Sequence, residues 1–147
     1  DMRETCNEKY DAIFNLFTSF GYFEDDADNY KTIKAIHNSL TETGFAVIDF
    51  MNVDYVVENL VADEVKSVDG IDFHIKRYLK DGHIYKEIDF EDKGEKFHFT
   101  EKVQALRLED FEKIMEEAGI YLLDIFGDYK LRKFFKTQSE RLIMIFK

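Results

Sequence analysis

Residues 10–26, YDAIFNLFTSFGYFEDD, join a short apolar run to an aromatic, partly polar stretch with an acidic end. Aromatic rings in a loop suit a pocket for a flat, partly apolar ligand, because rings supply contact area and a few polar groups fix the orientation. We therefore expect Phe17, Ser19 and Tyr22 to contact a ligand there. The alternative is that the rings of this stretch are ordinary core.

The apolar run itself, AIFNLF at residues 12–17, has the length and composition of a buried strand. Core packing is the interpretation that we favour for Phe14 and Leu16 within it. A second run of the same kind, FAVIDF, occupies residues 45–50. The sequence therefore predicts two buried strands in its first third.

The segment between these strands has apolar residues at helical spacing and acidic residues at its start, which is typical of a helix beginning near Asp25. A strand, a helix and a strand in this order form a right-handed crossover with parallel strands. Parallel sheets bind ligands outside the carboxyl ends of their strands. This rule indicates the loop after residue 17 and the turn at residues 49–52, where we expect Asn52 to contact a substrate.

After a helix predicted over residues 53–61, the sequence changes to alternation near Gly70 and carries hairpin signals at Asp81-Gly82 and Lys93-Gly94. These features predict a three-stranded antiparallel sheet. Both turns together fix a register with one apolar and one polar face. The apolar rows are Phe73–Phe90–Phe97, Ile75–Ile88–Phe99 and Leu79–Ile84–Val103, and the polar rows are His74–Asp89–His98 and Lys76–Glu87–Thr100.

One further row of the apolar face is charged, with Arg77 opposite Lys86 and Glu101 beyond it. Like charges directly opposite each other are destabilising, and one carboxylate leaves the row with a net positive charge. An ion-pair row at the rim of the sheet, with its charged ends in water, is one interpretation. The other is that Arg77 and Lys86 bind an anionic substrate through a carboxylate or phosphate.

Metal and thiol chemistry have less support. His74 and His98 both neighbour Asp89, but a solvated polar face explains this row better than a metal site does. Cys6 is the only cysteine, so neither an intrachain disulfide nor a CxxC metal site is available. We expect no bound metal.

The bulk composition excludes several classes of protein. The chain has 147 residues, 45% of them hydrophobic and 16% aromatic, which is typical of a folded domain. Its net charge of −11, without a basic run, argues against nucleic acid as a partner. No apolar run reaches the roughly 20 residues of a membrane span, and we expect a cytoplasmic protein. The glycines form neither GxGxxG nor a P-loop.

The last third returns to helix and strand, with a helix at LEDFEKIMEEAG, a strand over residues 120–126 and a last strand at RLIMIF. The succession DMRE, YDAIFNLFTSFGYF, LTETGFAVIDFMN, an antiparallel insert, LEDFEKIMEEAGIYLLDIFGDY and RLIMIFK resembles the C-terminal half of a class I S-adenosylmethionine-dependent methyltransferase of the small-molecule type. The resemblance covers essentially the whole chain. LTETG replaces the Leu-Lys-Pro-Gly-Gly turn that the family often has.

This resemblance implies an α/β fold that contains the fourth to seventh strands of a Rossmann-like seven-stranded sheet, plus the insert. Residues 1–147 would then be one partial domain. Its parts would be residues 1–52 with the fourth and fifth strands, 53–107 with the insert, and 108–147 with the last two strands. The family's glycine-rich first loop and its ribose-binding acidic residue are absent from this chain. We expect it to bind S-adenosylmethionine poorly and to be inactive alone.

The resemblance also implies site residues. Asp1 would meet the adenine amino group and Met2 would lie along the ring, while Asn15, Leu16 and Phe17 would lie beside the sulfonium and its methyl group. Methyl transfer is an in-line displacement, for which positioning matters most, so a general base is not required and we name none. Tyr22 or Tyr129 would help to orient the nucleophile.

The first residue is Asp1 rather than Met, so we expect the chain to be part of a longer protein. Residues 12–17 would then form an open apolar edge at what should be the centre of a sheet, and such an edge invites pairing with another copy. We therefore predict a homodimer through this strand. A non-catalytic interaction module that kept half of the fold is the alternative to a methyltransferase.

Overall fold

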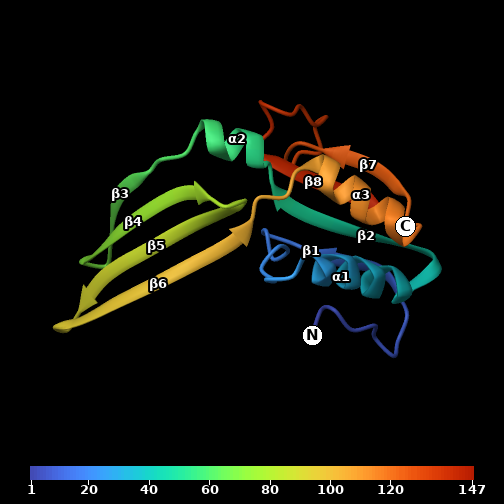
Figure 1. The fold of residues 1–147 in the computed structure, drawn as a ribbon, viewed down its shortest axis with the longest axis horizontal. Coiled ribbons are helices and arrows are strands. Elements are labelled where there is room, and N and C mark those ends of the chain that lie inside the picture. The colour runs from blue at the N-terminus through green and yellow to red at the C-terminus, as the bar shows by residue number, and fades with distance from the viewer. The chain divides into compact units, whose positions relative to one another are not determined.

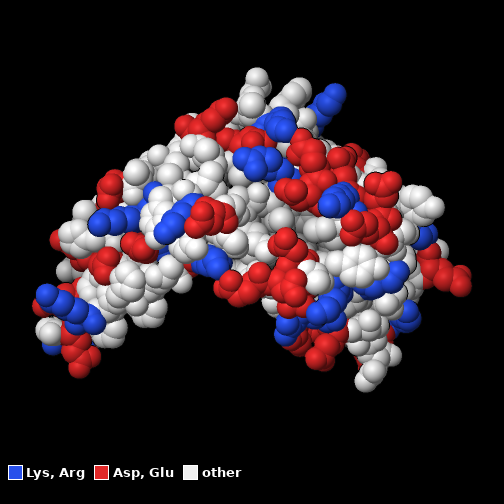
Figure 2. Space-filling view, in the orientation of Figure 1, with Lys and Arg blue, Asp and Glu red and all other residues white.

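The computed structural model describes residues 1–147, which form two compact units (Figure 1). The α/β unit contains Asp1–Val56 and Leu106–Lys147, and the insert unit contains Val57–Ala105. Figure 2 shows acidic and basic side chains interleaved over the visible surface of each unit. No helix has the length and apolar character that are needed to cross a membrane.

The α/β unit is built on a four-stranded sheet in the order β1-β2-β8-β7. Its strands are β1 (Tyr10–Asn15), β2 (Leu40–Met51), β7 (Leu122–Phe126) and β8 (Arg141–Phe146). β1 and β2 are parallel, as predicted, whereas β8 is antiparallel to both of its neighbours. The carboxyl ends of β1 and β2 therefore meet at one edge of the sheet.

All three predicted helices are present, but the one predicted over residues 53–61 ends earlier, at Glu58, within the insert unit. They are α1 (Asp26–Asn38), α2 (Val53–Glu58) and α3 (Leu108–Ala118). Asp25 caps α1 by accepting a hydrogen bond from the Ala27 N–H at 2.9 Å, and Gly119 ends α3 in the left-handed conformation. α1 and α3 lie next to each other on one face of the sheet (Figure 1).

Three phenyl rings from different elements form the centre of the core of the α/β unit. Phe111 of α3 lies 5.4 Å from the ring of Phe20 and 5.3 Å from that of Phe50, and all three are fully buried. Burial of each ring contributes about 2 kcal/mol. Phe20 belongs to the loop after β1, so this cluster ties one end of that loop to the core.

The insert unit is an antiparallel sheet in the order β3-β4-β5-β6. Its strands are β3 (Asp63–Val68), β4 (Ile71–Lys80), β5 (His83–Asp92) and β6 (Glu95–Gln104). The predicted register is confirmed, since Ile75 pairs with Ile88, which pairs with Phe99. The sheet has four strands rather than the three predicted. β3 was missed because Asp69-Gly70 was interpreted as a boundary, whereas it is a third hairpin turn.

Candidate functional site

The loop after β1 has an unusual backbone. Phe17 and Thr18 both have positive φ angles, of 58° and 57°. Bulky and β-branched residues rarely adopt this left-handed conformation, which costs of order 1–3 kcal/mol per residue. Two such residues in succession require support from their surroundings, and the support comes from β2.

Asp49 of β2 holds this strained loop in place. Its side chain is only 1% exposed. The Phe17 N–H donates to Asp49 Oδ2 at 2.9 Å, and the Thr18 N–H donates to the Asp49 backbone oxygen at 3.0 Å. The loop is closed further on by Ser19, whose Oγ lies 2.7 Å from the backbone oxygen of Leu16.

Two side chains from the C-terminal segment complete the surroundings of this carboxylate. Arg141 places Nε 2.8 Å and Nη2 2.7 Å from Asp49 Oδ1, and the Tyr129 hydroxyl donates to Asp49 Oδ2 at 3.0 Å. Arg141 Nη2 also donates to Thr18 Oγ1 at 2.9 Å. The buried negative charge is thus neutralised and hydrogen-bonded, as a buried carboxylate requires. Asp49, Arg141, Tyr129 and the Phe17–Thr18 backbone form what we call the Asp49 cluster.

The phenol of Tyr129 stays protonated in this environment. Desolvation of its partly buried hydroxyl raises the pKa of Tyr129 although the ring is exposed, and the hydrogen bond to Asp49 raises it further, while the positive charge of Arg141 acts in the opposite direction. A protonated tyrosine that donates a hydrogen bond to a carboxylate is a poor general base near neutral pH.

The aromatic rings beside the Asp49 cluster project outward. Phe17 is 77% exposed and Tyr129 is 62% exposed, with their ring centroids 6.5 Å apart in an edge arrangement. Tyr22, predicted to contact substrate, is also exposed. The interpretation of Phe14 and Leu16 as core is wrong for this chain, because β1 is an edge strand and leaves Phe14 57% exposed.

A cavity of about 370 Å³ lies beside β1. It is lined by the N-terminal segment, β1 and α1, and its lining includes Asp1, Met2 and Asn15. The structure therefore brings three of the five predicted cofactor residues to one cavity. Leu16 and Phe17 lie outside its lining, at the strained loop.

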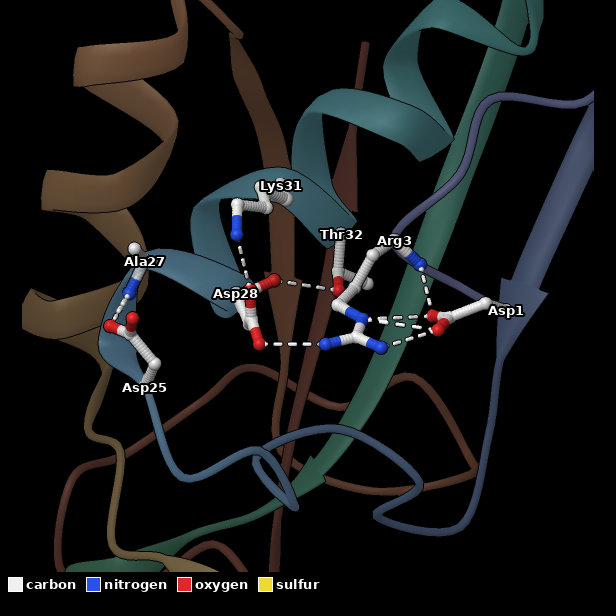
Figure 3. A network of polar contacts seen from close by, with 7 residues as sticks. All are labelled: Asp1, Arg3, Asp25, Ala27, Asp28, Lys31 and Thr32. Atoms are coloured by element: carbon white, nitrogen blue, oxygen red, sulfur yellow. Dashed lines mark hydrogen bonds and ion pairs between the residues drawn. The ribbon is translucent and has the colours of Figure 1, made fainter.

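Asp1 is engaged within the protein. Arg3 Nε lies 3.0 Å from Asp1 Oδ1 and Arg3 Nη2 lies 2.5 Å from Asp1 Oδ2, while Arg3 Nη1 reaches Asp28 at 2.8 Å (Figure 3). Hydrogen bonds from Lys31 and Arg3 lower the pKa of Asp28. The guanidinium also lies 4.7 Å from the ring centroid of Phe23. An adenine amino group that donated a hydrogen bond to Asp1 would therefore share its carboxylate with the Arg3 guanidinium.

Asn52 is buried and has a structural partner for each amide proton. Its Nδ2 donates to the backbone oxygens of Lys136 at 2.8 Å and Ser139 at 2.7 Å. These bonds hold the loop before β8 against the end of β2. Contact between Asn52 and a substrate remains a prediction. Both amide protons of Asn52 already donate to backbone oxygens, so they are not available to a substrate.

In the insert unit, the charged row has a neighbouring carboxylate that the sequence did not indicate. Glu64 of β3 lies 2.5 Å from Arg77 Nη2, and Glu101 lies 3.2 Å from Lys86 Nζ. Glu64 pairs with Ile75 in the adjacent row, so a second carboxylate beside the charged row balances its two cations. The hydrogen bond from Arg77 lowers the pKa of Glu64.

The histidine row of the insert forms a hydrogen-bonded chain. Asp89 Oδ1 lies 2.8 Å from His98 Nδ1, and His98 Nε2 lies 3.2 Å from Thr100 Oγ1. These side chains are exposed on the polar face. No group of three or more His, Cys, Asp and Glu side chains is arranged to hold a metal ion.

Sequence reasoning indicated the turn at residues 49–52 and the Tyr129 ring but missed Asp49 and Arg141 as a pair. The signal was present, because Asp49 is the one charged residue in FAVIDF and Arg141 the one in RLIMIF. A charge in each of two apolar strands that pair with each other predicts a buried ion pair. Thr18 as the acceptor for Arg141 had no sequence signal.

Comparisons with known proteins agree with this architecture. No family model matches the chain. A glycine/sarcosine/dimethylglycine N-methyltransferase of Actinopolyspora halophila is 27% identical over 124 residues, and a glycine/sarcosine N-methyltransferase of Halorhodospira halochloris is 25% identical over 126 residues. Each match covers 83% of this chain. The crystal structure of an S-adenosylmethionine-dependent methyltransferase from Clostridium acetobutylicum matches all of the chain with a TM-score of 0.86 and 25% identity.

The chain resembles the C-terminal part of a class I S-adenosylmethionine-dependent methyltransferase. If β1, β2, β7 and β8 are the methyltransferase's fourth to seventh strands, their order in the sheet is four, five, seven, six. S-Adenosylmethionine is the cofactor that this resemblance indicates, and it is bound in the structure of CalS10, an amino pentose methyltransferase whose 15% identity shows the fold alone.

The chain is shorter than these methyltransferases. Its match spans 21% and 45% of the two curated relatives and 62% of the Clostridium chain. It therefore spans less than two thirds of each. The part of the methyltransferase fold that this chain contains includes the strained loop, the Asp49 cluster and the insert.

Proposed function

We propose that this chain forms the part of an S-adenosylmethionine-dependent methyltransferase at which the methyl group is transferred to a small molecule. The observation that carries the proposal is the strained loop at the carboxyl end of β1, where Asp49 holds Phe17 in a left-handed conformation with its ring outward. Strain that the surroundings enforce is typical of functional sites. Its place in the fold is the edge at which α/β sheets bind ligands.

The residues of this edge fit the methyl end of the cofactor. S-Adenosylmethionine supplies an electrophilic methyl group on a positively charged sulfur. We assign Asn15, Leu16 and Phe17 to this end, because an aromatic face and backbone oxygens attract a cation. Asp1 and Met2, on the cavity beside β1, are assigned to the adenine.

The protein's contribution to the reaction is position and exclusion of water. In such a transfer the acceptor atom would bond to the methyl carbon as the carbon–sulfur bond breaks, and the electron pair of the broken bond would go to sulfur. Alignment of the two reactants supplies most of the rate enhancement for such a displacement. Phe17 and Tyr22 offer apolar walls for this step, and the Ser19 hydroxyl offers a polar group for orientation.

A small acceptor with a carboxylate or phosphate is the substrate class that we propose. The curated relatives are named for glycine and sarcosine, whose carboxylates are the kind of group that arginine binds. Arg77 and Lys86 are the residues proposed for this contact, and a substrate carboxylate would have to compete with Glu64 and Glu101. Asn52 is also proposed as a substrate contact, through its side-chain carbonyl oxygen.

A second candidate function follows from the open edge of β1. This strand has a neighbour on one side only, and Tyr10 and Phe14 on it are exposed. An unpaired apolar edge favours strand addition. We therefore also propose a homodimer through residues 12–17, and a cytoplasmic location in keeping with the single cysteine. As an interaction module alone, the chain would dimerise without binding cofactor.

Calorimetric titration with S-adenosylhomocysteine, the unreactive product, tests the methyltransferase proposal. We expect weak, saturable binding that Phe17→Ala abolishes, while Phe99→Ala, which removes an exposed ring of the insert, leaves it unchanged. Absence of saturable heat, or binding that is indifferent to Phe17→Ala, would overturn the proposal. Dimerisation in the absence of binding would favour the interaction module.

A further inference from the structure

The Asp49 cluster joins three segments that are far apart in the chain. The carboxylate of Asp49 receives hydrogen bonds from the loop after β1, from the segment between β7 and β8, and from the start of β8. Phe17, Tyr129 and Arg141 are the donors. Arg141 also contacts both sides of this edge, through its hydrogen bond to Thr18 Oγ1 and its place 5.8 Å from the Tyr129 ring centroid.

The chemistry of the cluster requires a carboxylate. Oδ1 accepts from the guanidinium, and Oδ2 accepts from the Phe17 N–H and the Tyr129 hydroxyl. An ionised carboxylate only accepts hydrogen bonds and has about four lone-pair sites. An asparagine of the same shape would present two N–H donors to one of these sides and would leave Arg141 without its counter-ion. Asp49→Asn is therefore nearly isosteric but chemically incompatible.

The conformation of the loop depends on these bonds. Left-handed Phe17 and Thr18 are unfavourable by themselves, and the observed supports are Asp49 for both N–H groups and Arg141 for the Thr18 hydroxyl. Without them the loop would relax to ordinary φ values. The ring of Phe17 would then leave its place beside Tyr129.

The hydroxyl and the ring of Tyr129 have separate parts in this arrangement. The hydroxyl is bonded to Asp49, which fixes the direction of the side chain. The ring stands exposed in an edge arrangement with Phe17, and the Arg141 guanidinium lies 5.8 Å from its centroid. The hydrogen bond at its hydroxyl and the guanidinium at its face thus give the exposed ring a defined direction at this edge.

We propose that Asp49 is a positioning residue that sets the Phe17 ring through the strained loop, and that the Tyr129 ring is a second wall of the pocket in which the methyl group is transferred. The role of the Tyr129 ring as a wall rests on the proposed function. The positioning of the Phe17 ring by Asp49 is a property of the chain without ligand. The two parts can therefore fail separately.

NMR spectroscopy of the whole chain without ligand tests the positioning. In Asp49→Asn we expect the amides of Phe17 and Thr18 to exchange at least about tenfold faster, as for loss of a buried hydrogen bond, and the contact between the Phe17 and Tyr129 rings to disappear. Asp124→Asn is the matched control, since Asp124 is exposed and bonds only the next residue's N–H. Unchanged exchange and an intact ring contact in Asp49→Asn would overturn the role of Asp49.

If Asp49→Asn does not fold, two substitutions at Tyr129 test the positioning through the hydrogen bond between Tyr129 and Asp49 instead. Tyr129→Phe and Tyr129→Leu both remove the hydroxyl, but only the second removes the ring. We expect equal, moderate acceleration of Phe17 amide exchange in the two variants. Identical exchange in the wild type and in both variants would show that the Tyr129 hydroxyl has no positioning role.

Titration with S-adenosylhomocysteine then separates the role of the Tyr129 ring as a pocket wall from the role of its hydroxyl as a hydrogen-bond donor to Asp49. We expect Tyr129→Phe to weaken binding about threefold and Tyr129→Leu at least about tenfold, with Tyr121→Phe, which changes an exposed ring elsewhere, at the wild-type value. Equal affinity of the Phe and Leu variants would overturn the ring as a wall. Binding absent from the wild type itself would instead refute the proposed function and leave the positioning result standing.

Discussion

At the scale of single residues, the site depends on a buried charge that has only one counter-ion. Asp49 is almost fully buried and pairs with Arg141, which is partly exposed. A buried pair adds little net stability, but removal of one partner leaves the other uncompensated. The same carboxylate supports the strained loop, so stability and function are coupled at this residue.

Replacement of Arg141 should therefore destabilise the fold strongly. We expect Arg141→Gln to lower the free energy of unfolding by roughly 3 kcal/mol, because Asp49 then remains buried without its counter-ion. Arg132→Gln is the control, since Arg132 forms an exposed pair with Asp128 and should change stability by no more than about 0.5 kcal/mol. Urea denaturation measures both, and equal effects would contradict the argument.

His37 of α1 should make stability depend on pH. Burial lowers the pKa of His37, and the charges of Lys34 and Lys9 lower it further. The unfolded chain therefore takes up this proton first as the pH falls, near pH 6.5, and the folded state loses stability relative to it from about pH 7 down to its own lower pKa. Above that window the histidine is neutral in both states and contributes nothing.

Urea unfolding of the wild type and His37→Gln at pH 7.5 and pH 5.5 measures this effect. The wild type should lose more free energy of unfolding between the two pH values than His37→Gln does. Lys34→Gln should reduce the loss partly, because it removes one repelling charge. Parallel pH dependence of the wild type and His37→Gln would show that the burial of His37 has no energetic effect.

At the scale of elements, the sequence predicted best what neighbouring residues determine. The register of β4, β5 and β6 followed from two turns, because Asp81-Gly82 and Lys93-Gly94 both adopt positive φ at each central residue. β3 was missed although Asp69-Gly70 has the same geometry. The exposure of Phe14 and the contact of Asp49 with Phe17 depend on which strands are adjacent, which local pattern does not specify.

The turn at Lys93 offers a stabilising substitution. Lys93 has φ of 51°, a conformation that asparagine adopts more easily than lysine does. We expect Lys93→Asn to raise the free energy of unfolding by about 0.5 kcal/mol. Lys96→Asn, in a strand two residues after the turn's glycine, should give no gain, and thermal unfolding of the two variants provides the comparison. A lower melting temperature for Lys93→Asn would contradict the turn assignment.

At the scale of the whole molecule, an open apolar edge and a large net charge have opposite effects on association. The exposed side chains of β1 favour pairing with a second copy, whereas a charge of −11 on each copy opposes it. Salt shortens the range of this repulsion to about 8 Å at physiological ionic strength but leaves the apolar contact intact. The balance therefore predicts dimerisation that strengthens as salt is added.

Sedimentation equilibrium at increasing salt concentration measures this balance. We expect the dimer fraction of the wild type to rise with salt, and Phe14→Lys to remain monomeric throughout, because a charged side chain on an edge strand disfavours strand addition. Phe99→Lys makes the same change of charge on an exposed phenylalanine of the insert unit and should dimerise as the wild type does. A dimer that Phe14→Lys retains, or that salt dissociates, would place the interface on charged surfaces away from β1.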